Sequence, residues 1–423
     1  MQQVGNVVQY ILNMGASVML PIMIFIIALI FRVKPAKALR SALTIGIGMV
    51  GINLVINLLT TNIGPAAKAM VKRFGFHLTI VDVGWPSAAA GAWAQPISSI
   101  LIPILLVVNI ILIMLKVTKT LDIDIWNYWH MVAAGSGAYI VTKSWAFSII
   151  SAILYMIFCL IIADKTAKSV QDFYGLEGIS FPTGSSDAFG LIGIPVAWVV
   201  AHTPGLKNLH ADSETIQQKF GIFGEPMMMG IIIGAAIGAL GGYDVAGILK
   251  LGINMGAVMM LMPRMVKLLM EGLIPISESA RDVLTKRYGA DREIYLGMDA
   301  ALSTGAPATL ATGLLLVPIT LFIAVILPGN RVLPFGDLAT IPFYVSLIVA
   351  SRKGNIIHSV IAGAIVITLA LLMATDFASV HTAMLQGVVQ IPAGSTQVSS
   401  LDMGGNFLNW ILLKLADLWN AVF

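Results

Sequence analysis

The chain has few of the residues that soluble proteins place on their surfaces and few that support redox chemistry. Only 11% of its 423 residues are charged, and its single cysteine, Cys159, lies in an apolar run. One cysteine excludes an intramolecular disulfide, and a thiol in apolar surroundings is a poor nucleophile. The sequence also has no zinc-ligand spacing, Walker loop, dinucleotide-binding glycine pattern or local Ser-His-Asp signature. We therefore predict no metal, no cofactor and no catalytic residues.

What the chain has in abundance is apolar sequence. Hydrophobic residues make up 58% of it, and the mean hydropathy is +0.90. Several continuous apolar runs are long enough, or nearly so, to cross a bilayer, and continuous rather than alternating runs favour helices. These runs cover residues 15–31, 97–115, 145–163, 311–328 and 356–375. The pattern predicts an all-α polytopic membrane protein. The net charge of +4 is spread over short clusters between the runs, so no nucleic-acid partner is expected.

A second feature is an internal repeat. Similar segments recur roughly 210 to 220 positions apart, and duplicated membrane halves interrupted by Gly and Pro are typical of transporters with a binding site between the halves. The recurring pairs are Lys72–Gly75 with Lys286–Gly289, Asp82 with Asp299, Gly84–Pro86 with Gly305–Pro307, Pro96 with Pro318, Asp124 with Asp337, Lys143 with Lys353, and Asp164 with Asp376.

The first copy predicts five spans and one interfacial amphipathic helix at 64–75. The spans are expected at 15–31, 41–60, 87–115, 125–142 and 145–163, with breaks at Pro96 and Pro103. Arg and Lys follow the first span, which favours an external N-terminus and a cytoplasmic first loop. Five spans that start outside end inside, so the second copy enters inverted.

The second copy contains additional material. Residues 179–205 carry a Ser/Gly/Asp cluster and three prolines, which indicates a re-entrant hairpin, and a last helix is expected at 404–420. The charged run from Arg281 to Arg292 is interpreted as a cytoplasmic face. The count comes to about eleven spans, divided into a first repeat (1–175), a second inverted repeat with insertions (176–385), and a C-terminal segment (386–423).

The candidate substrate-binding residues are polar or aromatic groups at predicted helix breaks. Ionisable residues at membrane depth usually face a cavity or a partner. Asp82 precedes Gly84-Trp85-Pro86, and Asp299 precedes Thr304-Gly305-Ala306-Pro307. Carboxylates here can accept hydrogen bonds from the hydroxyls of a polyol, while Trp85 can stack on its C–H face. The alternative is that each aspartate only caps a helix.

Four further residues have two possible interpretations each. His130 lies in an apolar helix and is either a ligand contact or a core histidine whose hydrogen bonds are satisfied. Asp187 ends the cluster Pro182–Asp187. This cluster either lines a re-entrant loop or forms an ordinary exterior turn. His202 either reaches the cavity or marks a helix end. Glu225 precedes Pro226, a pattern that is also typical of an ordinary helix N-terminus.

Three neighbouring segments then show a specific resemblance. The stretch from Gly305 to Thr320, followed by Leu327–Arg331 and Leu333–Leu338, resembles the galactitol-specific IIC components of the bacterial phosphotransferase system, in the ascorbate–galactitol permease group. The segments 83–86 and 224–226 fit as well, and the resemblance extends over almost the whole chain.

The resemblance implies a multi-pass permease of the bacterial inner membrane, not itself an enzyme. It implies two inverted five-helix repeats plus a last helix, arranged as core and scaffold domains of an elevator-type homodimer surrounded by lipid. It implies a hexitol substrate, most simply galactitol, held near Asp82, Trp85, His130 and Asp299. The partners would be a separate IIB protein at the cytoplasmic face, which phosphorylates the sugar, and IIA upstream.

Two other functions compete with this one. An ion-coupled secondary transporter of a polar small molecule would share the inverted halves but would not need IIB. A membrane scaffold without transport would not need paired aspartates at helix breaks.

Overall fold

The structure is a computed structural model that describes residues 16–75, 78–212, 214–215, 222, 225–288, 293–334, 336–386 and 395–422. The first half contains α2 (Ala16–Ile30), α3 (Pro35–Phe74), β1 (Ile80–Asp82), α4 (Gly84–Ala94), α5 (Ser98–Met114), β2 (Thr120–Asp122), η1 (Ile125–Asn127), α6 (Tyr128–Thr142), α7 (Trp145–Tyr174), β3 (Ile179–Ser180) and α8 (Gly184–His202). The second half contains α10 (Pro226–Leu240), α11 (Val245–Tyr288), β4 (Tyr295–Gly297), η3 (Ala300–Gly305), α12 (Pro307–Ile326), β5 (Val332–Leu333), η4 (Leu338–Thr340), α13 (Ile341–Tyr344), α14 (Ser346–Ser351), α15 (Ile356–Met384), β6 (Gln397–Ser399), α16 (Leu401–Gly404) and α17 (Phe407–Val422).

The described chain is mostly helical, as predicted. By length and composition, six of its helical segments are able to cross a membrane: 35–74, 145–174, 184–202, 245–273, 307–326 and 356–384. Three shorter apolar helical stretches accompany them, at 100–114, 227–240 and 338–351. These findings confirm a polytopic helical membrane protein.

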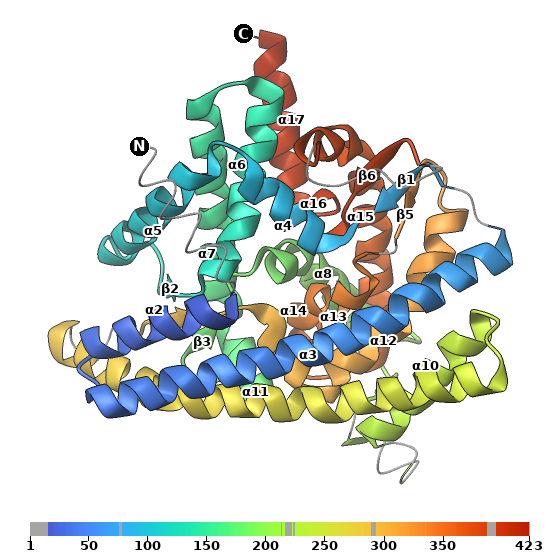
Figure 1. Cartoon of the computed structure of the whole chain (residues 1–423), viewed down its shortest axis with the longest axis horizontal. Coiled ribbons are helices and arrows are strands. Elements are labelled where there is room, and N and C mark those ends of the chain that lie inside the picture. Colours follow the sequence, from blue (N-terminus) through green and yellow to red (C-terminus); the bar gives the residue numbers. More distant parts are fainter. Residues whose placement is uncertain are drawn as a thin grey trace.

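The two longest helices, α3 and α11, pack against each other along the longest axis of the molecule (Figure 1). Their contacts show that they are antiparallel: Gly48 approaches Leu269, Gly51 approaches Met265, and the Asn254 amide donates to Asn62 Oδ1 at 2.6 Å. Helix α2 packs on α3 and α10 packs on α11. These four helices form one layer, and the helices α6, α7, α15 and α17 run at a steep angle to it in Figure 1.

The helices are interrupted at two small parallel sheets. One has the strand order β5-β1-β6 and the other β2-β4-β3. In the first, Ile80 pairs with Val332 on one side and with Gln397 on the other. In the second, Leu296 pairs with Leu121 and Ile179. Each sheet therefore has a central strand from one half of the chain and two outer strands from the other half.

The structure confirms some predicted boundaries and corrects others. The break at Pro96 is confirmed, since α4 ends at Ala94 and α5 begins at Ser98, but Pro103 lies inside α5 and does not interrupt it. The span at 41–60 and the amphipathic segment 64–75 form one continuous helix, α3. The predicted hairpin at 179–205 is wrong: β3 is followed by the single 19-residue helix α8, which accommodates Pro195. Gly224 and Arg292 lie outside the described residues.

Small residues allow α10 and α11 to pack closely. Gly230 and Gly234 of α10 face Met255, while Gly252 and Gly256 of α11 face Ile231. Membrane helices associate largely through such close van der Waals packing, because lipid provides no hydrophobic driving force between them.

We predict that Gly234→Ala destabilises the protein. A Cβ at this position would lie 2.7 Å from Met255 Cγ and 2.8 Å from the Leu251 carbonyl oxygen, and overpacking of this kind costs roughly 1–3 kcal/mol. Gly64→Ala is the control, because a Cβ at Gly64 of α3 meets nothing within 4 Å. Thermal unfolding in one detergent should show a lower midpoint for Gly234→Ala only; equal midpoints would contradict this account of the packing.

Candidate functional site

A cavity of about 280 Å³ lies where several helices begin. The beginnings of α4, α6, α8 and α16 meet η3 and η4 there, and α3 closes one side. The lining residues are Met49, Ile52, Asn53, Ile56, Trp85, Trp126, Trp129, His130, Ser185, Asp299, Ala301, Ala339, Thr340, Phe343 and Asp402. Apolar walls with a few convergent polar groups, at the small end of the usual range of roughly 300–1,000 Å³, are typical of small-molecule sites. We call this the central cavity.

Three tryptophans form the aromatic wall of the central cavity. The rings of Trp85 and Trp126 are edge to face, with centroids 6.0 Å apart, and Trp129 lies 6.4 Å from Trp85. Trp129 also packs on the His130 ring at 3.7 Å. The rings hold one another by edge and offset contacts of the kind that stabilise aromatic clusters, so the wall is rigid.

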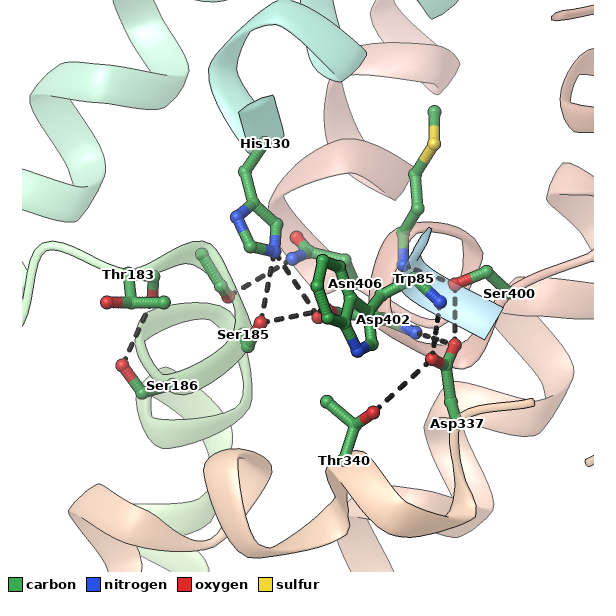
Figure 2. A network of polar contacts seen from close by, with 12 residues as sticks. Trp85, His130, Thr183, Ser185, Ser186, Asp337, Thr340, Ser400, Asp402 and Asn406 are labelled. Atoms are coloured by element: carbon green, nitrogen blue, oxygen red, sulfur yellow. Dashed lines mark hydrogen bonds and ion pairs between the residues drawn. The ribbon is translucent and has the colours of Figure 1, made fainter. Parts of the chain in front are cut away.

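Next to this wall, His130, Ser185 and Asp402 form a buried polar group (Figure 2). The Ser185 hydroxyl donates to Asp402 Oδ2 at 2.9 Å. His130 Nε2 lies 3.1 Å from Ser185 Oγ and 3.3 Å from Asp402 Oδ1. The network therefore assigns the proton to Nε2. His130 Nδ1 has no hydrogen-bond partner among the described residues, which leaves it as an acceptor.

Gly184 allows His130 to sit against the start of α8. A Cβ on Gly184 would lie 2.5 Å from His130 Cγ. On the other side, Asn406 donates to the Tyr155 hydroxyl at 2.8 Å and to the Gly184 carbonyl at 3.2 Å. The amino end of α8 is thus fixed between α6, α7 and the segment after α16.

Asp337 holds the other helix beginnings together (Figure 2). Its Oδ1 accepts from the Trp85 amide at 2.7 Å. Its Oδ2 accepts from the Ser400 hydroxyl at 2.6 Å and from the Asp402 amide at 3.0 Å. One fully buried carboxylate therefore satisfies donors from α4 and from the β6–α16 junction, which otherwise lack partners at membrane depth.

Asp82 completes this arrangement from behind the cavity. It accepts from the Gly84 amide at 2.9 Å and from the Asp337 amide at 2.8 Å. Gly336 and Gly84 touch backbone to backbone, because a Cβ on Gly336 would lie 2.2 Å from the Gly84 nitrogen. Asp82 is buried but does not line the central cavity, so the structure gives it a positioning role.

The chain is similar to known proteins over nearly its whole length. The family model of the PTS system sugar-specific permease component, EIIC-GAT, matches residues 10–394. The chain belongs to this family. It is 40% identical over 411 residues to the PTS system galactitol-specific EIIC component of Escherichia coli strain K12, covering 97% of this chain and 91% of that protein. It is 38% identical over 410 residues to a putative permease IIC component of the same strain, covering 97% and 93%.

Of the residues predicted from sequence, the permease brings Trp85, His130 and Asp299 into the central cavity. Asp299 also caps η3, since its carboxylate accepts from the Ala301 amide at 2.7 Å. Thr304 is buried in η3, and its hydroxyl bonds the Ala301 carbonyl instead of facing the cavity.

The other predicted residues lie away from the cavity lining. Asp187 is fully buried in the first turn of α8, and neither of its oxygens has a hydrogen-bond partner among the described residues. His202 is at the exposed end of α8, where it packs on Trp198 at 4.2 Å. Glu225 precedes Pro226 at the start of α10. His202 and Glu225 therefore lie at helix ends, which is the second of the two interpretations given for each.

The central cavity of the permease is also lined by four polar residues that were not predicted from the sequence: Asn53, Ser185, Thr340 and Asp402. Ser185 lay within the Ser/Gly/Asp cluster that drew attention to Asp187. Ser185 and Asp402 each lie shortly after a strand that ends in serine, Ser180 in β3 and Ser399 in β6. That parallel between β3–α8 and β6–α16 was the available signal.

We predict that Asp337→Ala destabilises the permease strongly. It would leave three buried donors without an acceptor, each at a cost of about 1–3 kcal/mol. Asp337→Asn keeps one carbonyl acceptor, so it should lose less. Asp376→Ala is the control, because Asp376 is partly exposed and binds Trp410 and Lys414 at the surface. The thermal midpoints should decrease in the order wild type, D376A, D337N and D337A. A midpoint for D337A that is no lower than that of D376A would refute the assigned role.

Proposed function

We propose that the permease binds galactitol or a similar hexitol in the central cavity and moves it across the bacterial inner membrane. The observation that supports this most directly is the polar chemistry of the lining. It offers the carboxylates of Asp299 and Asp402, the ring of His130 and the hydroxyls of Ser185 and Thr340. Among the described residues that line it there is no lysine or arginine. A site rich in acceptors with aromatic walls fits a neutral polyhydroxy molecule, and its carboxylates repel a phosphate ester.

The product is therefore released after phosphorylation and does not return. A hexitol phosphate carries charge that the central cavity disfavours. The phosphoryl donor is a separate IIB protein docked at the cytoplasmic face, with IIA upstream of it. The name of the galactitol-specific relative in Escherichia coli supports the choice of substrate.

The two sheets support an inverted repeat. In one sheet β1 of the first half lies between β5 and β6 of the second half, and in the other β4 of the second half lies between β2 and β3 of the first half. Corresponding helices also have similar lengths, with 40 and 44 residues in α3 and α11 and 30 and 29 in α7 and α15. The boundaries predicted at 175 and 385 remain a prediction. The element order favours units of 16–202 and 226–422 instead, with β3–α8 and β6–α17 closing each unit.

An elevator mechanism is supported by where the cavity lies. Met49, Ile52, Asn53 and Ile56 come from α3, whereas the remaining lining residues come from elements outside the α2–α3 and α10–α11 layer. Movement of the helix-break region along α3 would carry the ligand with it. The layer is the scaffold in this scheme, and a homodimer formed through it remains a prediction.

Asp299→Asn tests the ligand role separately from the capping role. Asparagine caps helices about as well as aspartate, so η3 should keep its structure. The substitution replaces a hydrogen bond to a charged group, about 1.5–3 kcal/mol, with one to a neutral amide oxygen, about 0.5–1.5 kcal/mol. Galactitol affinity measured by calorimetry should therefore fall about fivefold to tenfold. The exposed Asp417→Asn serves as the control. Galactitol affinity within twofold of wild type for D299N would exclude Asp299 as a ligand contact.

Uptake in proteoliposomes tests the coupling. We expect galactitol to accumulate, as its phosphate, only when the phosphorylated IIB protein is present on the cytoplasmic side. Accumulation of unmodified galactitol driven by a proton or sodium gradient without IIB would instead support the ion-coupled transporter. Absence of both uptake and galactitol binding would support a protein with no transport role.

A further inference from the structure

A second and larger cavity, of about 610 Å³, lies on the other side of η3. It is bounded by the end of α7, the middle of α11, the start of α12, the turn after α14 and part of the segment after α8. We call it the outer cavity. Its lining residues include Phe173, Lys267, Leu302, Gly305, Pro307 and Lys353.

The two cavities share η3 as a partition. Asp299 and Ala301 line the central cavity, while Leu302 and Gly305 line the outer one. This partition is a six-residue 3-10 segment, and 3-10 hydrogen bonds have poorer geometry than those of an α-helix.

The outer cavity has the cations that the central cavity lacks. Lys267 of α11 and Lys353 of the turn after α14 line it, and both are exposed. Neither lysine makes an ion pair with another described residue. Asp212 and Glu214 also line the cavity. Asp212 is occupied, since it accepts from the Thr215 amide at 2.6 Å and pairs with His210 at 2.7 Å. The hydrogen bond from the Thr215 amide lowers the pKa of Asp212.

The backbone fixes Lys353 next to the amino end of α12. Lys353 and Gly354 both have positive φ, 51° and 83°. A Cβ on Gly354 would lie 2.9 Å from the Phe173 ring and 3.7 Å from Ala308 Cβ, so the turn packs on the first turn of α12. This 20-residue helix begins with Pro307 and has no side-chain cap. Its amino end therefore adds a partial positive charge to that of the two lysines.

We propose that the outer cavity is a binding site for a phosphomonoester, the phosphorylated hexitol that the permease releases. Lys267, Lys353 and the amino end of α12 would bind the phosphate, and the carboxylates of the central cavity would oppose its return. The half of α7 that ends at this cavity carries Lys165 and Lys168. Because lysine and arginine are enriched on the cytoplasmic side of membrane proteins, the cavity lies on that side in this proposal. This proposal rests on the proposed function and adds to it a place for the charged product.

The test is a pair of titrations on the full-length permease in lipid nanodiscs, one with galactitol 1-phosphate and one with galactitol. The double variant Lys267→Gln/Lys353→Gln should bind the phosphate ester at least tenfold more weakly than wild type and galactitol within twofold. Lysine side chains exposed to solvent can be replaced with little effect on folding, and the unchanged galactitol affinity verifies it. In wild type, inorganic phosphate should reduce binding of galactitol 1-phosphate and leave binding of galactitol unchanged.

Lys143→Gln is the matched control. Lys143 also ends a helix with positive φ, 54°, and it corresponds to Lys353 in the sequence repeat, but it lines neither cavity. It should bind both ligands as wild type does.

The outcomes separate the two proposals. If wild type binds galactitol but not its phosphate, or if the double variant binds the phosphate as tightly as wild type, the outer cavity is not the phosphate site and the proposed function stands. If wild type does not bind galactitol, the proposed function fails and the phosphate site fails with it.

Discussion

The fold depends on the pairing of backbone groups where helices are broken inside the membrane. An unpaired amide or carbonyl in a hydrocarbon environment costs several kcal/mol, so a chain can leave the helical conformation at that depth only if the protein supplies partners. Here the partners are two three-stranded parallel sheets and the carboxylates of Asp82 and Asp337. The outer strands of each sheet come from the opposite half of the chain to its centre, so neither half can satisfy its breaks alone.

This constraint also creates the candidate binding site, the central cavity. Because helices begin at the breaks, their polar first turns converge, and side chains on those turns are held by short hydrogen bonds. His130, Ser185 and Asp402 come from three different helices and meet through contacts of 2.9–3.3 Å. Asp337 stands one layer further out and fixes both Trp85 and Asp402 through their amides. The cavity is therefore pre-formed, and its polarity differs from that of the lysine-lined cavity beyond η3.

The sequence was sufficient to predict the class of protein and some of the residues that line the candidate site, while the inverted repeat remains a prediction. Breaks with Gly and Pro indicated where Trp85 and Asp299 would gather, although Asp82 lies outside the cavity lining. His130 stood out as a polar residue in an apolar helix. The short strands were not predictable, because two or three residues have no measurable periodicity. Asn53 was missed because α3 looked like a span followed by an interfacial helix, and only tertiary packing shows which of its faces meets the cavity. Asp402 and Ser185 are 217 positions apart, and only the resemblance between the segments β3–α8 and β6–α16 relates one to the other. Pro195 misled the prediction for α8, since proline is tolerated in membrane helices whose neighbours satisfy the freed backbone groups.

The most direct test of the account is a cryo-electron microscopy structure of the permease in nanodiscs with saturating galactitol. The account predicts density for one polyol in the central cavity, stacked on Trp85 and within hydrogen-bond distance of Asp299 or Asp402. Polyol density elsewhere, or an empty central cavity at saturating ligand, would contradict it.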